Sequence, residues 1–358
     1  MTIPVDALKT PKTSSTSRSA QLSLARVLAC LAIVTLHTVF AANEYFLDTV
    51  SGTENLISRA VENNMMWAVP VFLMVTGALQ LKTDKKLSLK KLYGRYIFRV
   101  GMALIVFSVL FRLFDVIMDG EKLTLSNVLL KAAAELITGR GWGHLWYLYL
   151  LIGLYVMLPF YRLIVRHSSE RELAYLAGVL FFFLSVIPCI EGFGVNINFY
   201  ISESLIYPLY LLAGHALYEG RFRLSSAAAA AMAVLPTIGI VVLDILKYGR
   251  GIEIPGVLFG YSSPLVVLQA AGVFALILRW SIRPEGRTGA AVFRIDGCTF
   301  GIYLISMLFV RLIFRYMKFN PYDMMPALTL AACTAGIFLL SWAATACLKL
   351  IPGFRKIL

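Results

Sequence analysis

Charged residues are scarce in this chain. Lys, Arg, Asp and Glu together make up 15% of its 358 residues, whereas ordinary soluble domains hold about 25%. Apolar residues make up 59%. This composition excludes an ordinary soluble fold and indicates an integral membrane protein.

Acidic residues are fewer than basic ones, which gives a formal net charge of +13. Nucleic-acid-binding proteins also carry such an excess, but their basic residues gather on one face of a soluble fold. Here the basic residues lie between apolar runs, so orientation in a membrane explains them better. We therefore expect membrane lipid and no nucleic acid among the partners.

Cysteine patterns are also missing. The five cysteines are scattered and form no C-x-x-C pair, so neither a disulfide framework nor a zinc site is indicated, and we expect them to pack in the interior. The sequence contains no strand pattern, internal repeat or phosphate-binding P-loop. We predict no bound metal and no permanently bound cofactor.

Long apolar runs are what the sequence has instead. A helix needs about 20 apolar residues to cross the hydrocarbon core, and ten segments qualify. We therefore predict an all-α integral membrane protein with about ten transmembrane helices. Residues 122–138 are amphipathic, and we expect them on the membrane surface. The predicted spans are 20–42, 64–82, 92–116, 144–165, 171–190, 200–218, 225–245, 257–279, 294–316 and 326–350.

The positions of Lys and Arg predict that both termini are cytoplasmic. With that orientation 23 of the 33 lie in cytoplasmic segments and their flanks, 9 lie in the outer segments, and Arg112 lies within the third span. We expect a cytoplasmic tail at 1–19, a ten-helix domain at 20–350 and a second cytoplasmic tail at 351–358. The first tail is polar and lacks a nearby small-residue cleavage site, so we do not interpret it as a signal peptide.

The first span contains an arginine and a histidine, Arg26 and His37. At 100° per residue they share one face of the helix, about 16 Å apart along its axis. Arg26 alone fits a residue that snorkels to the interface, and His37 alone fits a packed histidine. Together they offer an anion anchor and a base, because neutral imidazole is well suited to accept a proton from a hydroxyl.

Further basic residues could bind phosphates or lipid headgroups. Arg95 and Arg99 lie four residues apart on one helix face, and their guanidinium groups suit phosphates. Orientation in the membrane and binding of anionic lipid headgroups explain the lysines before them as well as a functional role does. Arg112 and Asp115 are expected to pair with each other. Arg311 and Arg315 suit snorkelling to the interface better than binding a lipid diphosphate.

Five segments, in order, resemble the membrane acyltransferase 3 family. They are R-x10-H from Arg26 to His37, "VPVFLMVTGALQL" at 69–81, "RYIFR" at 95–99, "HLWYLYLLIGLYVMLP" at 144–159 and "TFGIYLIS" at 299–306. Thr76 replaces the usual serine of the second motif, and Ser306 stands where histidine is common. "HLWYLY", "INFYISESLIYPLYLLAGHALYEG" and the proline of "YSSPLVV" resemble most the branch with the enterobacterial common antigen O-acetyltransferase and polysaccharide O-succinyltransferases.

This resemblance implies transfer of an acyl group, usually acetyl from acetyl-CoA, to a hydroxyl of a surface glycan or its polyprenyl-linked precursor. It implies that His37 is catalytic and that Arg26, Arg95 and Arg99 lie on the side of the acyl-CoA donor. It also places the protein in the bacterial inner membrane as a multi-pass enzyme.

The acceptor is expected in the outer half, near the start of the fourth span. His144 could carry a proton or orient the acceptor, and Trp146 and Tyr147 could stack on a sugar or belong to an interfacial aromatic belt. Thr76, beside Gly77, could stabilise an oxyanion or allow close helix packing. Outside these motifs, Glu203 could bind a sugar hydroxyl or face solvent.

The main alternative is a transporter or flippase of a lipid-linked saccharide or small metabolite. Ten spans with buried charge fit it, but the paired half repeats of such transporters are not evident. The sequence leaves open the acyl group, the acceptor sugar, direct transfer or an acyl-enzyme relay, and the oligomeric state, homo-oligomer included.

Overall fold

The computed structural model describes residues 15–46, 50, 52–84, 87–197 and 199–358. Every regular element within these residues is a helix, which confirms the all-α prediction. Of the predicted tail at 1–19, residues 1–14 lie outside the described residues, and the first helix begins at Ser15.

Within this described part of the chain, eight helical segments are long and apolar enough to cross a membrane, and each matches a predicted span. Single π-helical turns extend or interrupt several of them, at Leu92–Ile97 (η3), Phe182–Val186 (η6), Ile245–Gly249 (η8) and Leu312–Tyr316 (η10). The α-helices of these segments are α1 (Ser15–Phe46), α4 (Leu89–Lys91), α5 (Phe98–Met118), α7 (Trp146–His167), α8 (Glu170–Phe181), α9 (Ile187–Gly192), α11 (Ser226–Asp244), α12 (Pro264–Ile277), α14 (Thr299–Arg311) and α15 (Pro326–Leu348).

Six further α-helices are shorter, more polar or both. They are α2 (Gly52–Asn64), α3 (Ala68–Gln80), α6 (Lys131–Thr138), α10 (Tyr207–Tyr218), α13 (Arg287–Asp296) and α16 (Pro352–Ile357). The last of these lies within the predicted tail 351–358 and packs against α5, so most of that segment is helical.

The predicted spans at 64–82 and 200–218 are represented by the short helices α3 and α10, which have 13 and 12 residues. The two helices cross at unusually close range. A Cβ at Gly77 would lie 1.9 Å from the carbonyl oxygen of Leu211, and one at Gly214 would lie 2.2 Å from Cα of Met74. Small residues that let backbones approach in this way drive helix association in membranes. Gly77 therefore has the packing role that the sequence left open.

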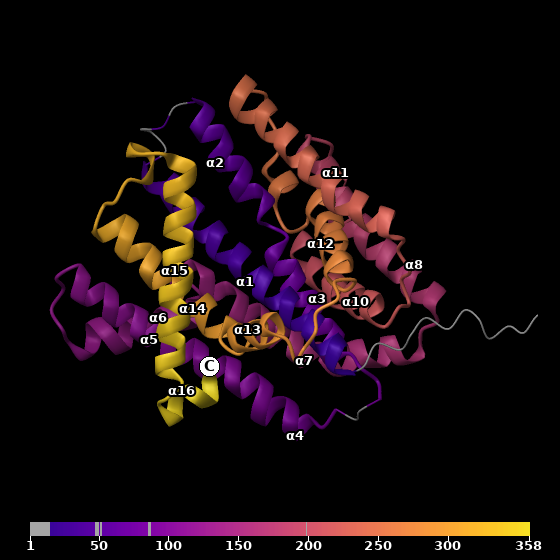
Figure 1. The fold of residues 1–358 in the computed structure, drawn as a ribbon, viewed down its shortest axis with the longest axis horizontal. Coiled ribbons are helices and arrows are strands. Elements are labelled where there is room, and N and C mark those ends of the chain that lie inside the picture. Colours follow the sequence, from indigo (N-terminus) through magenta and orange to yellow (C-terminus); the bar gives the residue numbers. More distant parts are fainter. Residues whose placement is uncertain (1–14, 47–49, 51, 85–86, 198) are drawn as a thin grey trace, which may run out of the picture.

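The long helix α1 runs through the middle of the molecule (Figure 1) and contacts α2, α3, α13, α14 and α15. Its contact face is built from small residues, and Ala25, Ala29 and Ala32 are all buried. This central position brings residues from distant parts of the sequence to the two ends of α1.

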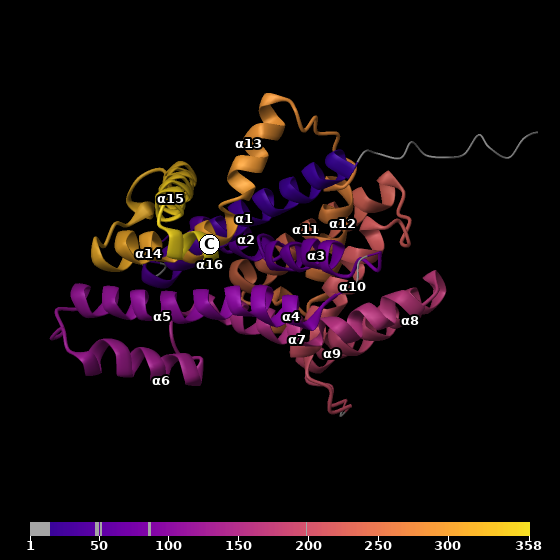
Figure 2. The ribbon, with the colours of Figure 1, turned by 90° about the horizontal axis from the view of Figure 1, so that it is seen from below.

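The predicted start of a span at residue 294 is wrong, because the chain forms two helices there. Helix α13 ends at Asp296, and α14 begins at Thr299 after Gly297 and Cys298. Glycine is a poor helix former and commonly ends helices. The break turns α13 away from the axis of α14 (Figure 2) and lays it against α1, which places Asp296 beside the N-terminal half of α1.

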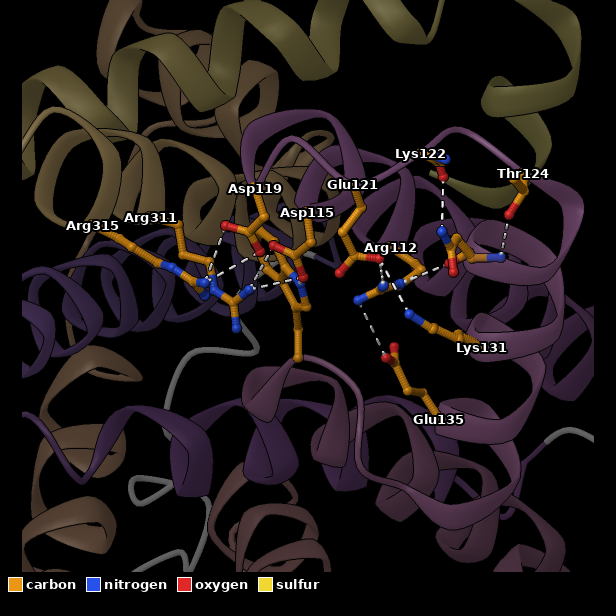
Figure 3. A network of polar contacts seen from close by, with 12 residues as sticks. Arg112, Asp115, Asp119, Glu121, Lys122, Thr124, Lys131, Glu135, Arg311 and Arg315 are labelled. Atoms are coloured by element: carbon orange, nitrogen blue, oxygen red, sulfur yellow. Dashed lines mark hydrogen bonds and ion pairs between the residues drawn. The ribbon is translucent and has the colours of Figure 1, made fainter.

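The segment predicted on the membrane surface, 122–138, contains α6, which runs alongside α5 (Figure 2). The expected Arg112–Asp115 pair is wrong. Arg112 reaches across to this segment, with its Nη2 2.6 Å from Oε2 of Glu121 and its Nε donating to the Asn127 carbonyl (Figure 3). An i, i+3 spacing makes two residues neighbours, but a better-placed acceptor on the opposite segment binds the guanidinium instead.

Candidate active site

Arg26 and His37 face two different cavities that lie one after the other along α1. Arg26 and Ile33 line the first, which we call the Arg26 cavity, with a volume of about 340 Å³. Leu36, His37 and Phe40 line the second, which we call the histidine cavity, with a volume of about 600 Å³. The shared face predicted for Arg26 and His37 therefore runs along both cavities.

In the Arg26 cavity the arginine is already paired. Its Nε donates to Oδ1 of Asp296 and its Nη2 to Oδ2, both at 2.6 Å, and the hydroxyl of Ser23 donates to Oδ2 at 2.7 Å. A bidentate pair of this kind has strong geometric preference. Asp296 thus compensates the charge of Arg26 and fixes its orientation.

The second basic residue of this cavity is Arg99. Its guanidinium donates to the backbone oxygens of Ile357, at 3.2 Å, and of Leu358, the residue that follows α16, and it lies over the ring of Phe300. The cavity is completed mainly by aromatic and apolar side chains. These are Phe72, Tyr96, Val100, Tyr147, Leu151, Tyr155 and Tyr303, with Thr76, Gly297 and Thr299 as small or polar members.

The histidine cavity is larger, and its lining is aromatic with an acidic rim. The aromatic members are Phe40, Tyr45, Trp146, Phe259 and Tyr261, and the acidic members are Glu44 and Glu62. Burial raises the pKa of Glu62, although hydrogen bonds from Asn43 and Arg59 work against that shift. Carbohydrates suit such a cavity, since aromatic rings supply apolar faces while nearby polar groups can bind hydroxyls.

Two histidines lie where the cavities approach each other. The ring centroids of His37 and His144 are 6.2 Å apart, and the ring of Tyr303 lies 6.5 Å from His37 and 5.6 Å from His144. Tyr303 lines the Arg26 cavity, while both histidines line the histidine cavity. The three rings therefore form the boundary between the two cavities.

The histidines carry unused hydrogen-bonding capacity. Nδ1 of His37 and both ring nitrogens of His144 are buried and make no well-formed hydrogen bond within the described residues. The Tyr303 hydroxyl donates to the backbone carbonyl of His144, so this hydrogen bond does not occupy the imidazole of His144. Buried polar groups without partners are costly, and they are concentrated at functional sites. Both imidazoles are therefore available to a substrate.

The structure separates several residues that the sequence grouped together. Trp146 lines the histidine cavity, but its neighbour Tyr147 and also Thr76 line the Arg26 cavity. The Thr76 hydroxyl donates to the Phe72 carbonyl at 2.9 Å, so its single hydrogen is not directed at an oxyanion. Arg95 and Glu203 are exposed, and neither lines one of the two cavities.

Two residues of the site were missed as individual candidates. Asp296 lies at the inner end of the predicted ninth span, at the membrane depth expected for Arg26. This common depth and the opposite charges of the two residues are the sequence features that indicate a pair. Tyr303 lies inside the "TFGIYLIS" motif, in which Ser306 stands where histidine is common. Ser306 is fully buried and donates to the Tyr303 carbonyl, so it lies within the helix packing.

The family comparison agrees with this geometry. The acyltransferase domain of the acyltransferase 3 family matches residues 19–346. This range contains nearly all of α1, the whole histidine cavity with its two histidines, and every residue that lines the Arg26 cavity except Leu358. No curated protein and no solved structure matches the chain. Because the match covers nearly the whole chain, the acyltransferase prediction is favoured over a transporter, and the chain belongs to the acyltransferase 3 family of multi-pass membrane acyltransferases.

Proposed function

We propose that this enzyme transfers an acyl group, acetyl in the first instance, from acyl-CoA to a hydroxyl of a cell-surface polysaccharide or its polyprenyl-linked precursor. The observation that carries the proposal is the meeting of two cavities at His37 and His144. A transferase that joins a donor from one side of a membrane to an acceptor on the other needs such an arrangement.

The donor enters the Arg26 cavity. A volume of about 340 Å³ suits the acyl-pantetheine arm rather than the whole cofactor. The nucleotide phosphates then lie at the mouth, near Arg99 and the exposed Arg95, where guanidinium groups bind phosphate oxygens in bidentate fashion. The arm passes the Arg26–Asp296 pair on its way to the histidines.

The acceptor occupies the histidine cavity. Trp146 and Tyr261, whose rings are 5.5 Å apart, offer a surface on which a sugar ring can stack. Glu44 and Glu62 at the rim can accept hydrogen bonds from its hydroxyls. Tyr147 and Thr76, which line the other cavity, then contact the donor rather than the acceptor.

His37 acts as the general base in a direct transfer. It takes the proton of the acceptor hydroxyl while the oxygen attacks the thioester carbonyl carbon. A C–O bond forms, the C–S bond breaks, and the CoA thiolate leaves with the electron pair and takes up a proton. His144, across the boundary, donates a hydrogen bond to the acceptor or carries the proton onward. No permanently bound cofactor takes part.

The proposed setting is the bacterial inner membrane, with the chain's two ends in the cytoplasm. The segments "HLWYLY" and "YSSPLVV" support placement near the O-acetyltransferases and O-succinyltransferases of surface polysaccharides. Acyl-CoA, the glycan or polyprenyl-linked sugar and membrane lipid are then its partners.

The test is transfer of radiolabelled acetyl from acetyl-CoA to glycan in membranes that contain the chain. His37→Ala should abolish labelling. The matched control is Thr35→Ala on the same helix, because Thr35 lines neither cavity of the site and its hydroxyl donates to the Leu31 carbonyl of its own helix. Succinyl-CoA is the second donor to try. Equal labelling by wild type and His37→Ala would overturn the role of His37.

A further inference from the structure

The loop that carries His144 is anchored by a single aromatic residue. Residues 139–143 contain three glycines, which confer little rigidity, and Trp142 is the aromatic residue among them. Trp142 is buried, with 4% of its surface exposed. Its ring stacks on Phe111 of α5, with centroids 4.2 Å apart and planes 9° apart.

Two charged residues hold Trp142 from its other sides. Its indole Nε1 donates to Oδ2 of Asp115 at 2.8 Å, and the guanidinium of Arg311 lies 3.9 Å from its ring centroid. Arg311 also donates to both carboxylate oxygens of Asp115, at 2.9 and 3.1 Å. The indole thus contacts the ring of Phe111 and the guanidinium of Arg311. A cation is attracted to the face of an aromatic ring, which stabilises the Arg311 contact.

The arrangement of Phe111, Asp115 and Arg311 around Trp142, called the clamp below, lies next to His144. The His144 ring lies 6.1 Å from the Trp142 ring and 5.3 Å from the Phe111 ring, centroid to centroid. Arg311 itself lines the histidine cavity. The carboxylate of Asp115 binds both Arg311 and the indole, so its loss removes one hydrogen-bond partner from each and leaves only the cation–π contact between them.

We propose that Asp115 is a positioning residue which, with Arg311, fixes Trp142 and thereby holds the ring of His144 at the boundary of the two cavities. This inference rests on the proposed function of that boundary. It replaces the expected roles of Asp115 as partner of Arg112 and of Arg311 as a snorkelling residue.

The chain offers a matched control one helical turn away. Asp119 and Arg315 join the same two helical segments as Asp115 and Arg311 (Figure 3), with Nη2 of Arg315 3.2 Å from Oδ1 of Asp119. This second pair is more exposed, and within the described residues neither member makes a hydrogen bond or a cation–π contact with the indole of Trp142. A general effect of breaking an α5–α14 ion pair would therefore be seen in both.

The experiment compares Asp115→Ala with Asp119→Ala in the purified full chain. A misplaced reacting group can cost about 100-fold in rate, so Asp115→Ala should lower kcat for acyl transfer by about that factor, with KM for acetyl-CoA changed less than about twofold. Asp119→Ala should change kcat less than about threefold. Equal losses in the two variants, or an unchanged kcat in Asp115→Ala, would overturn the proposal.

Trp142→Phe serves if Asp115→Ala does not fold, because it keeps an aromatic ring to stack on Phe111 and removes the Nε1–H donor together with the rest of the indole. It should lower kcat in the same direction, by about tenfold, with KM for acetyl-CoA unchanged. A kcat equal to that of the wild type would count against the clamp.

A readout that needs no acyl transfer separates this proposal from the proposed function. Reaction of His144 with diethylpyrocarbonate, followed by mass spectrometry, reports how firmly the loop is held. Labelling should be about tenfold faster in Asp115→Ala than in the wild type and unchanged in Asp119→Ala, because local release exposes buried groups. Unchanged labelling in Asp115→Ala contradicts the clamp even if the wild type transfers no acetyl.

Discussion

Arg26 and Asp296, 270 positions apart in the sequence, form a bidentate ion pair in the wall of the Arg26 cavity. The side chain of Asp296 is 10% exposed and that of Arg26 is 31% exposed, so the pair is partly withdrawn from water. An arginine that would cost much free energy alone in the membrane is thereby compensated within the protein. Its charge is available to a donor only in competition with Asp296.

The first prediction follows from this pairing. Removing one partner leaves the other charge buried and unpaired, whereas removing both does not. Asp296→Ala and Arg26→Ala should each lower the unfolding temperature. The double variant should lose less stability than the sum of the two single losses. The coupling energy of the double-mutant cycle, measured by thermal unfolding in detergent, should be about 1–3 kcal/mol. As a control, the same cycle with Arg95→Ala in place of Arg26→Ala should show no coupling to Asp296→Ala, because Arg95 is exposed.

Thr76 provides the second prediction. Its hydroxyl hydrogen is directed to the carbonyl of Phe72 in its own helix. Removal of a true oxyanion-hole donor costs about 100- to 1,000-fold in kcat. We expect Thr76→Val, which keeps the shape and removes the hydroxyl, to change kcat for acyl transfer less than about threefold. A loss near 100-fold would mean that the hydroxyl turns toward the substrate during the reaction.

The sequence predicted local features of this enzyme well, because they depend on neighbouring residues. Apolar run length alone located the eight spanning segments, and the 3.6-residue period placed Arg26 and His37 on one face. The same period separates adjacent residues by 100°, which explains why Trp146 and Tyr147 line different cavities. That division could have been read from the sequence.

The contacts between distant segments could not be predicted in this way. The partner of Arg26 lies on α13 because the chain turns after Asp296, and nothing near Arg26 encodes that turn. Arg112 and Asp115 have the correct spacing to pair, yet each binds a group on another segment. Charge in a membrane protein is paired across the tertiary structure, so a single span cannot reveal its partner.

The third prediction concerns the crossing of α3 and α10. A methyl group at Gly214 would overlap the backbone of Met74, which cannot move as a flexible side chain could. Overpacking a core usually costs about 1–3 kcal/mol, and a clash with backbone falls at or above that range. We expect Gly214→Ala to reduce the amount of folded protein severalfold, measured by fluorescence-detected size exclusion. Gly153→Ala on α7 is the control, since a Cβ there would meet no atom within 4 Å.

The fourth prediction concerns pH and the attachment of α6 to α5. Hydrogen bonds from Lys131 and Arg112 lower the pKa of Glu121 below its ordinary value of 4.5. A carboxyl group with a lowered pKa stabilises the folded state at pH values above its ordinary pKa, and this contribution is lost as the pH falls through the folded pKa. Amide protection factors in α6, measured by hydrogen exchange, should therefore be steady from pH 7 to about pH 5 and fall as the pH drops below 4.5.

Substitution isolates Glu121 from its neighbours in this measurement. Burial raises the pKa of Glu135, whose carboxylate lies 4.0 Å from Arg112, so protonation of Glu135 begins above pH 4.5 and favours the folded state there, before the contribution of Glu121 is lost. Glu121→Gln should lower the protection of α6 at pH 7 and remove most of its decrease below pH 4.5. If the decrease in protection is the same in Glu121→Gln as in the wild type, another group controls the attachment of α6, and Glu121 is merely a solvent-exposed partner of Arg112.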